Sequence, residues 1–509
     1  MKKNVTILRI IAAMMVMLML VSAFAACAET TPNEETTAGA ETKDGATQAP
    51  VVEGPETDAN GFPVDDLPEL DYKGETINLL VWDDVEHEEF EIAYENLSGD
   101  IVEQSIYDRN AKVSERLKIT LNFIRQDGDS DNLEKWNNYV HTSVSVNARE
   151  FDILAGYSLS IAANAANGYL FNMLDSECEY LNFEQPWWSK LLLEQATFGD
   201  SLYFASGDIS RNALEMMYVC YANTQLLDKH NLENPQNFVA SGDWTYDKFI
   251  EMCSGVHEDD GDGVKDCTKD EGDVFGYITS GIHTDPWFYG SGATICERNA
   301  EGEIVVSESF KSGERVINTL TKLKGLLVDS NDGIYTSSVT HQTAFGQGRS
   351  LFMMERARVS HKVLAANYGE TEFVILPCPK YDKEQENYIT VMGNPFTLYA
   401  IASDIQDPSR ASAVIECFAS EGFRIVTPAV FELSLKTRYV DDPISGQMYD
   451  IIRENITYDI GRIFSNALIG QGDWRNAVAS SAQWTTTVAP KLIKLARALD
   501  TLNATLIDG

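Results

Sequence analysis

The sequence predicts an α/β fold built around a largely parallel sheet. Three short apolar segments, Thr76–Trp82, Ile119–Ile124 and Phe151–Ala155, have the length and composition of buried strands. Between the first two, residues 100–117 place valine, isoleucine and leucine on one face of a helix. Strands that alternate with helices in this way pair in parallel through crossover connections. Roughly 440 residues follow the N-terminal segments, which is enough for two lobes.

The later part of the chain adds strands and then becomes helical. Further strands are expected at Leu202–Ala205, Met217–Tyr221, Phe373–Pro377 and Phe396–Ile401. The first pair and the second pair are candidates for two crossings between the lobes. Thr245 is expected to cap the N-terminus of a helix, and the chain after Pro408 is expected to be mainly helical.

The N-terminus has the pattern of a bacterial export signal. Two lysines precede the apolar stretch Ile10–Val21, and small residues then lead to Cys27. A cysteine after two alanines resembles the lipobox of bacterial lipoproteins, whose thiol is lipidated. We therefore expect residues 1–26 to be a lipoprotein signal peptide and Cys27 to hold the protein, outside the cytoplasm, on the bacterial cell membrane. A transmembrane anchor and a plain secretory signal with an accidental cysteine are the alternatives.

Residues 27–70 form an acidic segment rich in Thr, Glu and Pro. It carries too little apolar surface to fold, so it is expected to be a disordered tether. The formal net charge of the chain is −39, and no basic patch with interleaved aromatic residues occurs. Such a protein repels nucleic acid, which excludes that class of partner.

The eight cysteines do not form a recognisable framework. Seven follow Cys27, their spacing is wide, and none belongs to a CxxC pair. Cys253 and Cys267 flank an acidic loop and could form a disulfide. Separate buried thiols are the alternative.

Six further segments occur in the order of a known family. They are Tyr180–Phe183 with Pro186–Trp188, Phe198–Ser210, Tyr221–Leu227, Gly242–Thr245, Phe345–Phe352 and Leu376–Asp382. The set resembles the extracellular solute-binding proteins of ABC importers, in the carbohydrate-associated family 1. The resemblance implies a two-lobed, periplasmic-binding-protein-like domain over residues 72–509, with a hinge and a ligand between the lobes.

Under this resemblance, lobe 1 would cover about 72–208 and 390–435, and lobe 2 about 210–379 and 436–509. The protein would capture a sugar or oligosaccharide and deliver it to the permease subunits of the importer. It would act as a monomer, without catalytic residues and without a required cofactor. A binding protein for a peptide or another non-sugar solute is the alternative, and a surface glycoside hydrolase is a second one.

A sugar site needs aromatic faces together with charged or amide hydrogen-bonding groups. Ligands of open α/β sheets lie beyond the carboxyl ends of strands, where Trp82, Asp83 and Tyr157 are expected. The resemblance adds Trp287 and Tyr289, at a position where the family often places a stacking aromatic. The expected ligand-binding residues are Trp82, Asp83, Tyr157, Asp208, Asn212, Trp287, Tyr289, Glu355, Arg356 and Trp474. The alternative for each is packing or a solvated loop, which is the expected role of Trp187 and Trp188.

The segment from Glu258 to Asp266 resembles the Asp-rich loop that binds calcium. Gly263 stands at the turn, but the twelfth position is Lys269 instead of glutamate. The expected ligands of a structural calcium ion are Glu258, Asp260, Asp262, Val264, Asp266 and Asp273. A solvated acidic turn is the alternative.

Enzyme motifs are incomplete in this chain. His87 and Glu88 are followed by Glu91 where a zinc-protease helix needs a second histidine. Residues 156–160 lack the final glycine of a nucleophile elbow, and no phosphate-binding Gly-Lys-Ser/Thr loop occurs. Paired carboxylates are abundant at this composition, so a glycosidase stays open as an alternative.

Overall fold

The computed structural model describes residues 56–508, apart from 86–87, 361–363, 365–366, 370, 431–442, 467, 469 and 481. The expected signal peptide, Cys27 and residues 27–55 of the expected tether lie outside the described residues. Residues 56–70 were also expected to be disordered, but they pack on the first lobe: Asp65 is buried and pairs with Arg116 at 2.6 Å. Within the described part, no helix is both long and apolar enough to cross a membrane. The seven later cysteines are all free thiols, so Cys253 and Cys267 are separate rather than paired.

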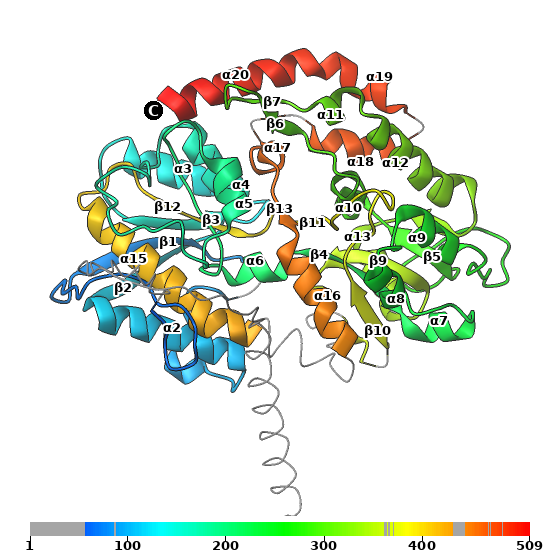
Figure 1. Ribbon diagram of the computed structural model, residues 1–509, viewed down its shortest axis with the longest axis horizontal. Helices are drawn as coiled ribbons and strands as arrows, with labels where there is room; N and C mark the ends of the chain where they lie inside the picture. Colours follow the sequence, from blue (N-terminus) through cyan, green and yellow to red (C-terminus); the bar gives the residue numbers. More distant parts are fainter. Residues whose placement is uncertain are drawn as a thin grey trace, which may run out of the picture. The chain divides into compact units, whose positions relative to one another are not determined.

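Four strands form the first sheet, in the order β12-β3-β1-β2 (Figure 1). β1 (Thr76–Trp82) lies between β2 (Thr120–Gln126) and β3 (Ile153–Tyr157) and pairs in parallel with both. β12 (Thr397–Ile401) pairs antiparallel with β3 at the edge. The predicted α/β fold is confirmed. We call this sheet and the helices that pack on it the first lobe.

The sequence sets both ends of the helix between β1 and β2. α2 (Ile101–Leu117) begins after Asp100, whose carboxylate accepts hydrogen bonds from two backbone N–H groups of the first turn. It ends at Lys118, which adopts a left-handed φ of 50°. Its buried face packs against α15 (Pro408–Glu421), a helix that comes almost three hundred residues later in the chain.

Five strands form the second sheet, in the order β10-β4-β9-β5-β8. They are β4 (Tyr218–Asn223), β5 (Phe275–Thr279), β8 (Gly333–Tyr335), β9 (Ser350–Arg356) and β10 (Phe373–Leu376). β5 pairs in parallel with β8 and β9, whereas β4 runs antiparallel to its neighbours β9 and β10. α9 (Tyr246–Cys253) packs on β5, and Thr245 caps it through its hydroxyl as predicted. We call this sheet and its helices the second lobe.

One expectation about the later strands was wrong. Leu202–Ala205 forms no strand; Ala205 makes only an isolated bridge to Tyr399 at the edge of the first sheet. The two expected crossings are present, because the chain passes from Ala205 at the first sheet to β4 in the second, and from β10 in the second sheet to β12 in the first. The apolar run at 202–205 did not show that a strand would be missing, because pairing depends on partners far away in the chain.

The remaining elements are short. The helices are α3 (Leu133–Val144), α4 (Ser158–Ala166), α5 (Lys190–Ala196), α6 (Arg211–Glu215), α7 (Thr224–Lys229), α8 (Gln236–Ser241), α10 (Asp285–Gly290), α11 (Glu308–Ser312), α12 (Glu314–Lys324), α13 (Ser338–Gly346), α16 (Pro443–Glu454), α17 (Ile460–Ile463), α18 (Gln471–Ala479), α19 (Trp484–Val488) and α20 (Leu492–Asp508). Single turns of helix are η1 (Tyr94–Asn96), η2 (Gly281–Thr284), η3 (Gly325–Asp329), η5 (Gly422–Val426) and η8 (Ala489–Lys491). Two-stranded sheets join β6 (Cys296–Arg298) to β7 (Ile304–Val306), and β11 (Thr390–Val391) to β13 (Ile456–Thr457).

Two chain segments that run between the lobes are bonded to each other. The first leads from Ala205 through α6 to β4, and the second leads from β10 to β12. The N–H of Gly393 donates to the carbonyl of Met216 at 2.8 Å, which joins the two segments. A Cβ at Gly393 would lie 3.0 Å from Cδ of Arg356 and 3.1 Å from the carbonyl oxygen of Met216, so a side chain there would force these neighbours to shift by a few tenths of an ångström.

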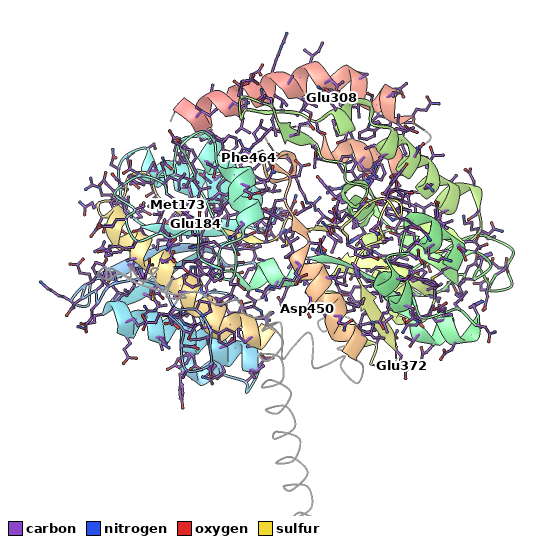
Figure 2. All side chains as sticks on the ribbon, viewed as in Figure 1. Met173, Glu184, Glu308, Glu372, Asp450 and Phe464 are labelled. Atoms are coloured by element: carbon purple, nitrogen blue, oxygen red, sulfur yellow. The ribbon has the colours of Figure 1, made fainter. Side chains whose placement is uncertain are left out.

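The C-terminal helix also connects the lobes (Figure 1). α20 contacts α4 of the first lobe and β7, which leads into α11 and α12. The side-chain amide of Asn503 accepts from the N–H of Ile304 and donates to its carbonyl, at 3.1 and 2.8 Å. Phe464, labelled in Figure 2, packs nearby against the rings of Phe198 and Phe204, with centroids 6.2 and 6.0 Å apart.

A buried carboxylate organises the first lobe. Glu416 of α15 accepts hydrogen bonds from the indole N–H groups of Trp187 and Trp188, at 2.9 and 3.1 Å, and from the backbone N–H of Asn182 at 3.2 Å. These bonds fix the loop before α5 onto α15. Burial raises the pKa of Glu416 to about 8.

The raised pKa predicts how stability depends on pH. The folded protein holds a proton on Glu416 between about pH 4.5 and about pH 8, where the unfolded chain has released it. The free energy of unfolding should therefore fall as pH rises through this window, by up to about 1.4 kcal/mol per pH unit from this group.

Denaturant unfolding at several pH values, on the wild type and on Glu416→Gln, measures this effect. The variant keeps an acceptor for one of the two indoles but cannot titrate, so its stability should change less with pH. Asp83→Asn, at an exposed position, serves as the control. Equal pH dependence in wild type and Glu416→Gln would contradict the assignment.

Candidate functional site

An aromatic pair lies at the carboxyl ends of the first sheet. Trp82 ends β1 and Tyr157 ends β3, and their ring centroids are 5.3 Å apart with planes tilted by 46°. The indole N–H of Trp82 donates to the hydroxyl of Thr397, the first residue of β12, at 3.0 Å. Both rings are buried. The sequence prediction that these two residues share one edge of the sheet is confirmed by the strand register.

Polar groups surround this pair. Glu89 is buried and accepts hydrogen bonds from the hydroxyls of Thr397 and Tyr399, each at 3.0 Å, and from the backbone N–H of Asn212 at 3.4 Å. Burial raises the pKa of this carboxyl group. We call Trp82, Glu89, Tyr157, Asn212 and Thr397 the first-lobe strand-end group.

The side chain of Asn212 is unusual within this group. It is fully buried, and neither its amide nitrogen nor its amide oxygen has a hydrogen-bond partner among the described residues. Leaving a buried amide unsatisfied costs about 1–3 kcal/mol per group, so such groups are rare without a functional reason. Asn212 was predicted as a ligand-binding residue, and its position beside Glu89 suits that role.

A second set of polar side chains lies at the ends of the second sheet. Glu355 and Arg356 end β9, and the Nε–H of Arg356 donates to Oε1 of Glu355 at 2.9 Å. The ring of His283, in η2, lies 6.0 Å from that of Tyr218 at the start of β4. Nδ1 of His283 is 3.4 Å from Oε2 of Glu355. We call Tyr218, His283, Asp285, Glu355 and Arg356 the second-lobe strand-end group.

Asp285 connects this group to the C-terminal helices. Its Oδ2 accepts from the guanidinium groups of Arg462 in α17 and Arg475 in α18, each at 2.6 Å. Burial works to raise the pKa of Asp285, but the two guanidinium charges outweigh it and hold that pKa below its usual value. Arg462 also donates to the carbonyl of Met392 at 2.9 Å, beside the bonded crossing segments.

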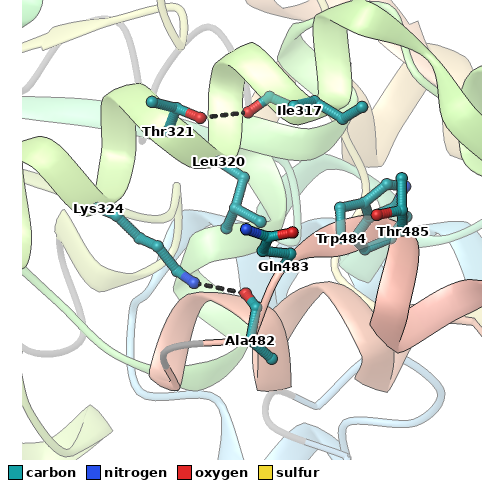
Figure 3. A pocket seen from close by; sticks show the side chains of 8 residues that line it. All are labelled: Ile317, Leu320, Thr321, Lys324, Ala482, Gln483, Trp484 and Thr485. Atoms are coloured by element: carbon teal, nitrogen blue, oxygen red, sulfur yellow. Dashed lines mark hydrogen bonds between the residues drawn. The ribbon is translucent and has the colours of Figure 1, made fainter.

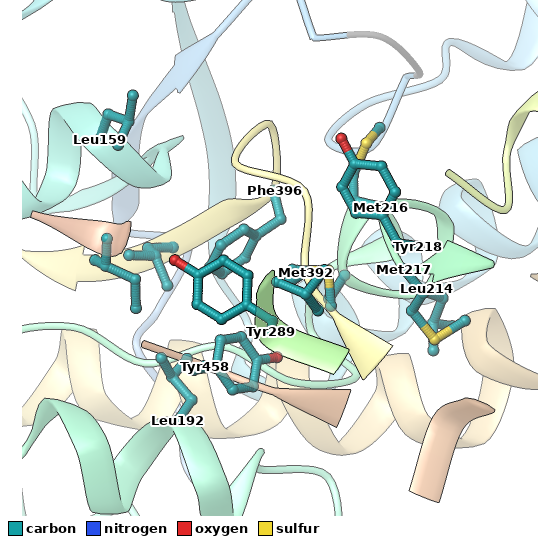
Figure 4. Packing of buried hydrophobic residues seen from close by; sticks show 14 of the residues in the cluster. Leu159, Leu192, Leu214, Met216, Met217, Tyr218, Tyr289, Met392, Phe396 and Tyr458 are labelled. Atoms are coloured by element: carbon teal, nitrogen blue, oxygen red, sulfur yellow. The ribbon is translucent and has the colours of Figure 1, made fainter. Parts of the chain in front are cut away.

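A pocket of about 220 Å³ opens where the two lobes adjoin. The residues that line it come from the loop before α5, the Gly207–Asp208 turn, α6, the end of α16 and β13, and they include Trp188, Asp208, Arg453 and Tyr458. Asp208 accepts from Arg453 at 2.9 Å and from the hydroxyl of Thr427, while burial raises its pKa. Figure 4 shows Tyr458 beside Phe396, and their ring centroids are 5.7 Å apart.

The fold can be compared with known structures at this point. No family model matches the chain, and no curated protein matches it. Solved structures do match. The chain superposes on the lacto-N-biose-binding protein of an ABC transporter from Bifidobacterium longum with a TM-score of 0.55, at 13% identity, over 84% of this chain and 98% of that one.

Two further matches are similar in extent. One is the GacH receptor of Streptomyces glaucescens, solved with acarbose, with a TM-score of 0.53 and 13% identity over 84% of this chain and 99% of that one. The other is an ABC substrate-binding protein from Listeria monocytogenes in complex with cycloalternan, with a TM-score of 0.52 and 12% identity over 85% and 99%. This chain has the two-lobed fold of the solute-binding proteins. The fold implied by the six sequence segments is thus confirmed.

Within this binding-protein fold, four predicted ligand residues lie outside both strand-end groups and the 220 Å³ pocket. Trp287 is fully buried, its N–H donates to the hydroxyl of Tyr277 at 3.1 Å, and its ring stacks on that of Tyr246 with centroids 4.6 Å apart. It packs in the core of the second lobe, where no face is open to a ligand. Asp83 is exposed and pairs with Arg125 at 2.8 Å.

Tyr289 and Trp474, by contrast, meet each other. Both line a small buried void together with Asp285, Phe288 and neighbouring residues. The void measures about 10 Å³, which is room for one water molecule and far too little for a sugar. The N–H of Trp474 donates to the carbonyl of Thr284 at 2.9 Å. Tyr289 and Trp474 therefore pack in the interior, which was the alternative to ligand binding for these aromatic residues.

A larger pocket lies away from the strand ends. It measures about 380 Å³ and is lined by α12 and by the residues from Ala482 to Thr485 (Figure 3). Its one lysine, Lys324, donates to the carbonyl of Ala482 at 2.7 Å. Lys324 and Gln483 are its charged and amide side chains, and Lys324 is already engaged by Ala482, so we do not assign a ligand to this groove.

The acidic loop brings together a set of carboxylates that differs from the predicted one. Oxygen atoms of Asp259, Asp260 and Asp273 lie within 4.8 Å of one another. Glu258 instead pairs with Lys229 at 2.6 Å, so the backbone turns the expected first ligand away and presents its neighbour Asp259. Asp273 is 1% exposed, and its Oδ2 has no hydrogen-bond partner among the described residues.

Sequence reasoning missed several members of these groups. Glu89 stands among other acidic residues, and nothing in the neighbouring sequence indicates that its side chain will be buried. Asp285 and its two arginines are separated by 177 and 190 residues. A local signal existed at His283 and Asp285, which are two titratable side chains within three residues, just after the apolar run of β5.

The placement of Trp287 predicts a structural effect. Trp287→Ala should lower the free energy of unfolding by about 3–5 kcal/mol, because it removes a large buried ring and the partner of Tyr277. Denaturant unfolding measures this change. Asp83→Asn should stay within about 0.5 kcal/mol of wild type, as is usual for exposed positions. A Trp287→Ala variant of unchanged stability would show that the ring is not core.

Proposed function

We propose that this protein is a lipid-anchored, extracytoplasmic substrate-binding protein of an ABC importer. It captures a sugar or oligosaccharide between its lobes and delivers the ligand to the permease subunits. The observation that carries the proposal is the two-lobed fold, in which aromatic and polar side chains collect at the facing strand ends. Three matched proteins of that fold were solved with, respectively, lacto-N-biose, acarbose and cycloalternan.

The chemistry of the first-lobe strand-end group supports a carbohydrate. Sugars offer apolar C–H faces, which stack on rings such as the Trp82–Tyr157 pair, and hydroxyls, which need donors and acceptors. The free amide of Asn212 supplies one donor group and one acceptor group in a buried position. The pocket near Asp208 repeats this combination with Trp188, Tyr458 and Arg453.

The connections between the lobes support capture by a hinge motion. The lobes are joined by the chain before β4, by the chain between β10 and β12, and by the chain that leads into α16. In proteins of this kind a few residues in such connections absorb the rotation while each lobe moves as a body. Separation of the lobes would bring water to the buried strand-end groups, and closure would replace that water with ligand.

The anchor is part of the proposal. The lipobox-like sequence at Cys27 would tie the protein to the outer face of the cell membrane, and residues 27–55 of the acidic segment would let the lobes reach the permease. Enzyme activity is not proposed, because the matched proteins are described as binding proteins and receptors.

A glycan-array screen followed by calorimetry on the mature protein tests the ligand class. We expect binding of a mono- or oligosaccharide without turnover. Asn212→Ala should then weaken binding by about 1–3 kcal/mol, because a buried amide loses its hydrogen bonds to the sugar. Asn138→Ala, an exposed asparagine of α3, is the matched control and should bind as wild type.

Other outcomes would identify another function. Hydrolysis of the oligosaccharide would indicate the glycosidase alternative. Binding of a peptide or another solute, with no response to any sugar, would indicate the non-sugar alternative. Wild-type affinity in Asn212→Ala would remove this residue from the site.

We also propose that the acidic loop binds a structural calcium ion through Asp259, Asp260 and Asp273. Calcium prefers such carboxylate oxygens. The buried Oδ2 of Asp273 has no hydrogen-bond partner among the described residues and lies 3.9 Å from Nε2 of His257, which leaves it available to a cation. Partial burial and the charges of Asp262 and Asp260 raise the pKa of Asp266, a repulsion that a cation would relieve.

Calcium at a hundred times its dissociation constant should therefore stabilise the protein by about 2.7 kcal/mol. Thermal unfolding with added calcium and with EDTA measures this shift. Asp273→Asn should abolish it, whereas Asp247→Asn, an exposed aspartate of the same lobe, should not. A midpoint that is indifferent to EDTA would exclude calcium.

A further inference from the structure

Two histidines and a glutamate converge inside the second lobe. His283 comes from η2, His341 from α13 and Glu355 from the end of β9. All three are buried, at 1%, 0% and 0% exposure. The imidazole centroids of His283 and His341 are only 4.3 Å apart. Titratable side chains from three elements that are distant in sequence therefore lie close together.

The distances match a metal coordination shell. Nδ1 of His283 and Nε2 of His341 each lie 3.4 Å from Oε2 of Glu355. Ligand atoms held at about 2.0–2.1 Å from a tetrahedral zinc ion are about 3.3–3.4 Å apart, since that is the edge of the tetrahedron. One ligand atom from each residue lies within 4.8 Å of the other two.

The hydrogen-bonding state of the imidazoles is the second observation. Both ring nitrogens of His283 and Nε2 of His341 are buried and have no hydrogen-bond partner among the described residues. Buried ring nitrogens without partners are costly in an apolar interior. A cation between them and Glu355 would satisfy one lone pair of each ring.

Outer hydrogen bonds orient two of the three groups. Nδ1 of His341 lies 3.4 Å from the hydroxyl of Ser280, which leaves Nε2 directed at Glu355. The amide of Gln342 donates to Oε2 of Glu355 at 2.6 Å, and Arg356 donates to Oε1 at 2.9 Å. Metal ligands are held by contacts of this kind, which fix both the tautomer and the ring orientation.

The protonation states of His283 and Glu355 also suit metal binding. Burial lowers the pKa of His283 to about 3, so this ring is neutral at physiological pH and its lone pair is available. For Glu355, burial opposes ionisation, but the charged Arg356 guanidinium beside it acts to lower its pKa, which lies below the usual range. Neutral imidazole and ionised carboxylate are the forms that bind a metal.

We propose that His283, His341 and Glu355 form a site for a divalent transition-metal ion, of which zinc fits the ligand set best. Two nitrogen ligands distinguish it from the all-oxygen set of the acidic loop, which suits calcium. The ion would pin η2 and α13 to the end of β9, next to the second-lobe strand-end group. Glu355 would then act on the solute indirectly, as a metal ligand. The proposal does not depend on the identity of the solute.

Calorimetric titration of the chelator-treated mature protein with zinc, in excess calcium, tests the site. The excess calcium occupies exposed carboxylates of this acidic chain. We expect one zinc ion per protein and loss of that binding in the double variant His283→Asn/His341→Gln. Ser280→Ala, which removes only the outer contact of His341, should weaken binding about 10-fold to 100-fold. Asp273→Asn, in the acidic loop, should bind zinc as wild type.

Cobalt substitution of the wild type supplies a measurement that needs no variant. A four-coordinate site gives the intense visible absorption of tetrahedral cobalt, and zinc should displace it in a 1:1 ratio. Absence of stoichiometric zinc binding, a weak octahedral cobalt spectrum, or zinc binding that survives in the double variant would each overturn the proposal. The three groups would then form a hydrogen-bonded cluster whose charge is balanced by protons alone.

Discussion

The two lobes are joined at a backbone contact, the hydrogen bond from Gly393 to Met216. It fastens two chain segments that run between the sheets, one leading into β4 and the other into β12. Arg356 packs against Gly393, and Arg462, which binds Asp285, holds the carbonyl of Met392, so the second-lobe strand-end group contacts this point. A side chain at 393 would crowd Arg356 and the Met216 carbonyl, which would have to shift by a few tenths of an ångström.

The second constraint is the balance of buried charge around this contact. Asp285 is shared by two arginines, Glu355 is paired with Arg356, and Glu89 is held by two hydroxyls. Removal of one member of such a set leaves an uncompensated charge in the interior, which costs far more than the pair contributes. These residues therefore constrain one another. The strand ends keep their arrangement although they contain little aliphatic packing of their own.

Local patterns in the sequence predicted the elements well. The apolar runs of β1 to β3, the helix from residue 100 to 117 and the cap at Thr245 depend on neighbours within a few residues, and all are present. The same reasoning placed Trp82 and Tyr157 together, because parallel strands end at one edge. It failed for Leu202–Ala205, whose apolar run lacks a pairing partner beyond one bridge.

The composition of the site was harder to predict for a physical reason. Trp287 looks the same in sequence whether it stacks on a sugar or on Tyr246, and its burial is decided by a helix forty residues away. The acidic loop was recognised from its spacing, but the pairing of Glu258 with Lys229 changed which carboxylates meet. His283 and His341 carry no motif at all, since their common partner Glu355 is brought in by the sheet.

The position of α20 has a consequence for the rate at which the lobes exchange solute. The helix contacts α4 of the first lobe. Its Asn503 is hydrogen-bonded to Ile304 of β7, which pairs with β6 and leads into α11 and α12. Any rotation that separates the lobes must either carry α20 along with one of them or break its contacts with the other. In the second case those contacts form part of the barrier to opening. The last seventeen residues of the described chain would then govern how long a solute stays, independently of how tightly its own site holds it.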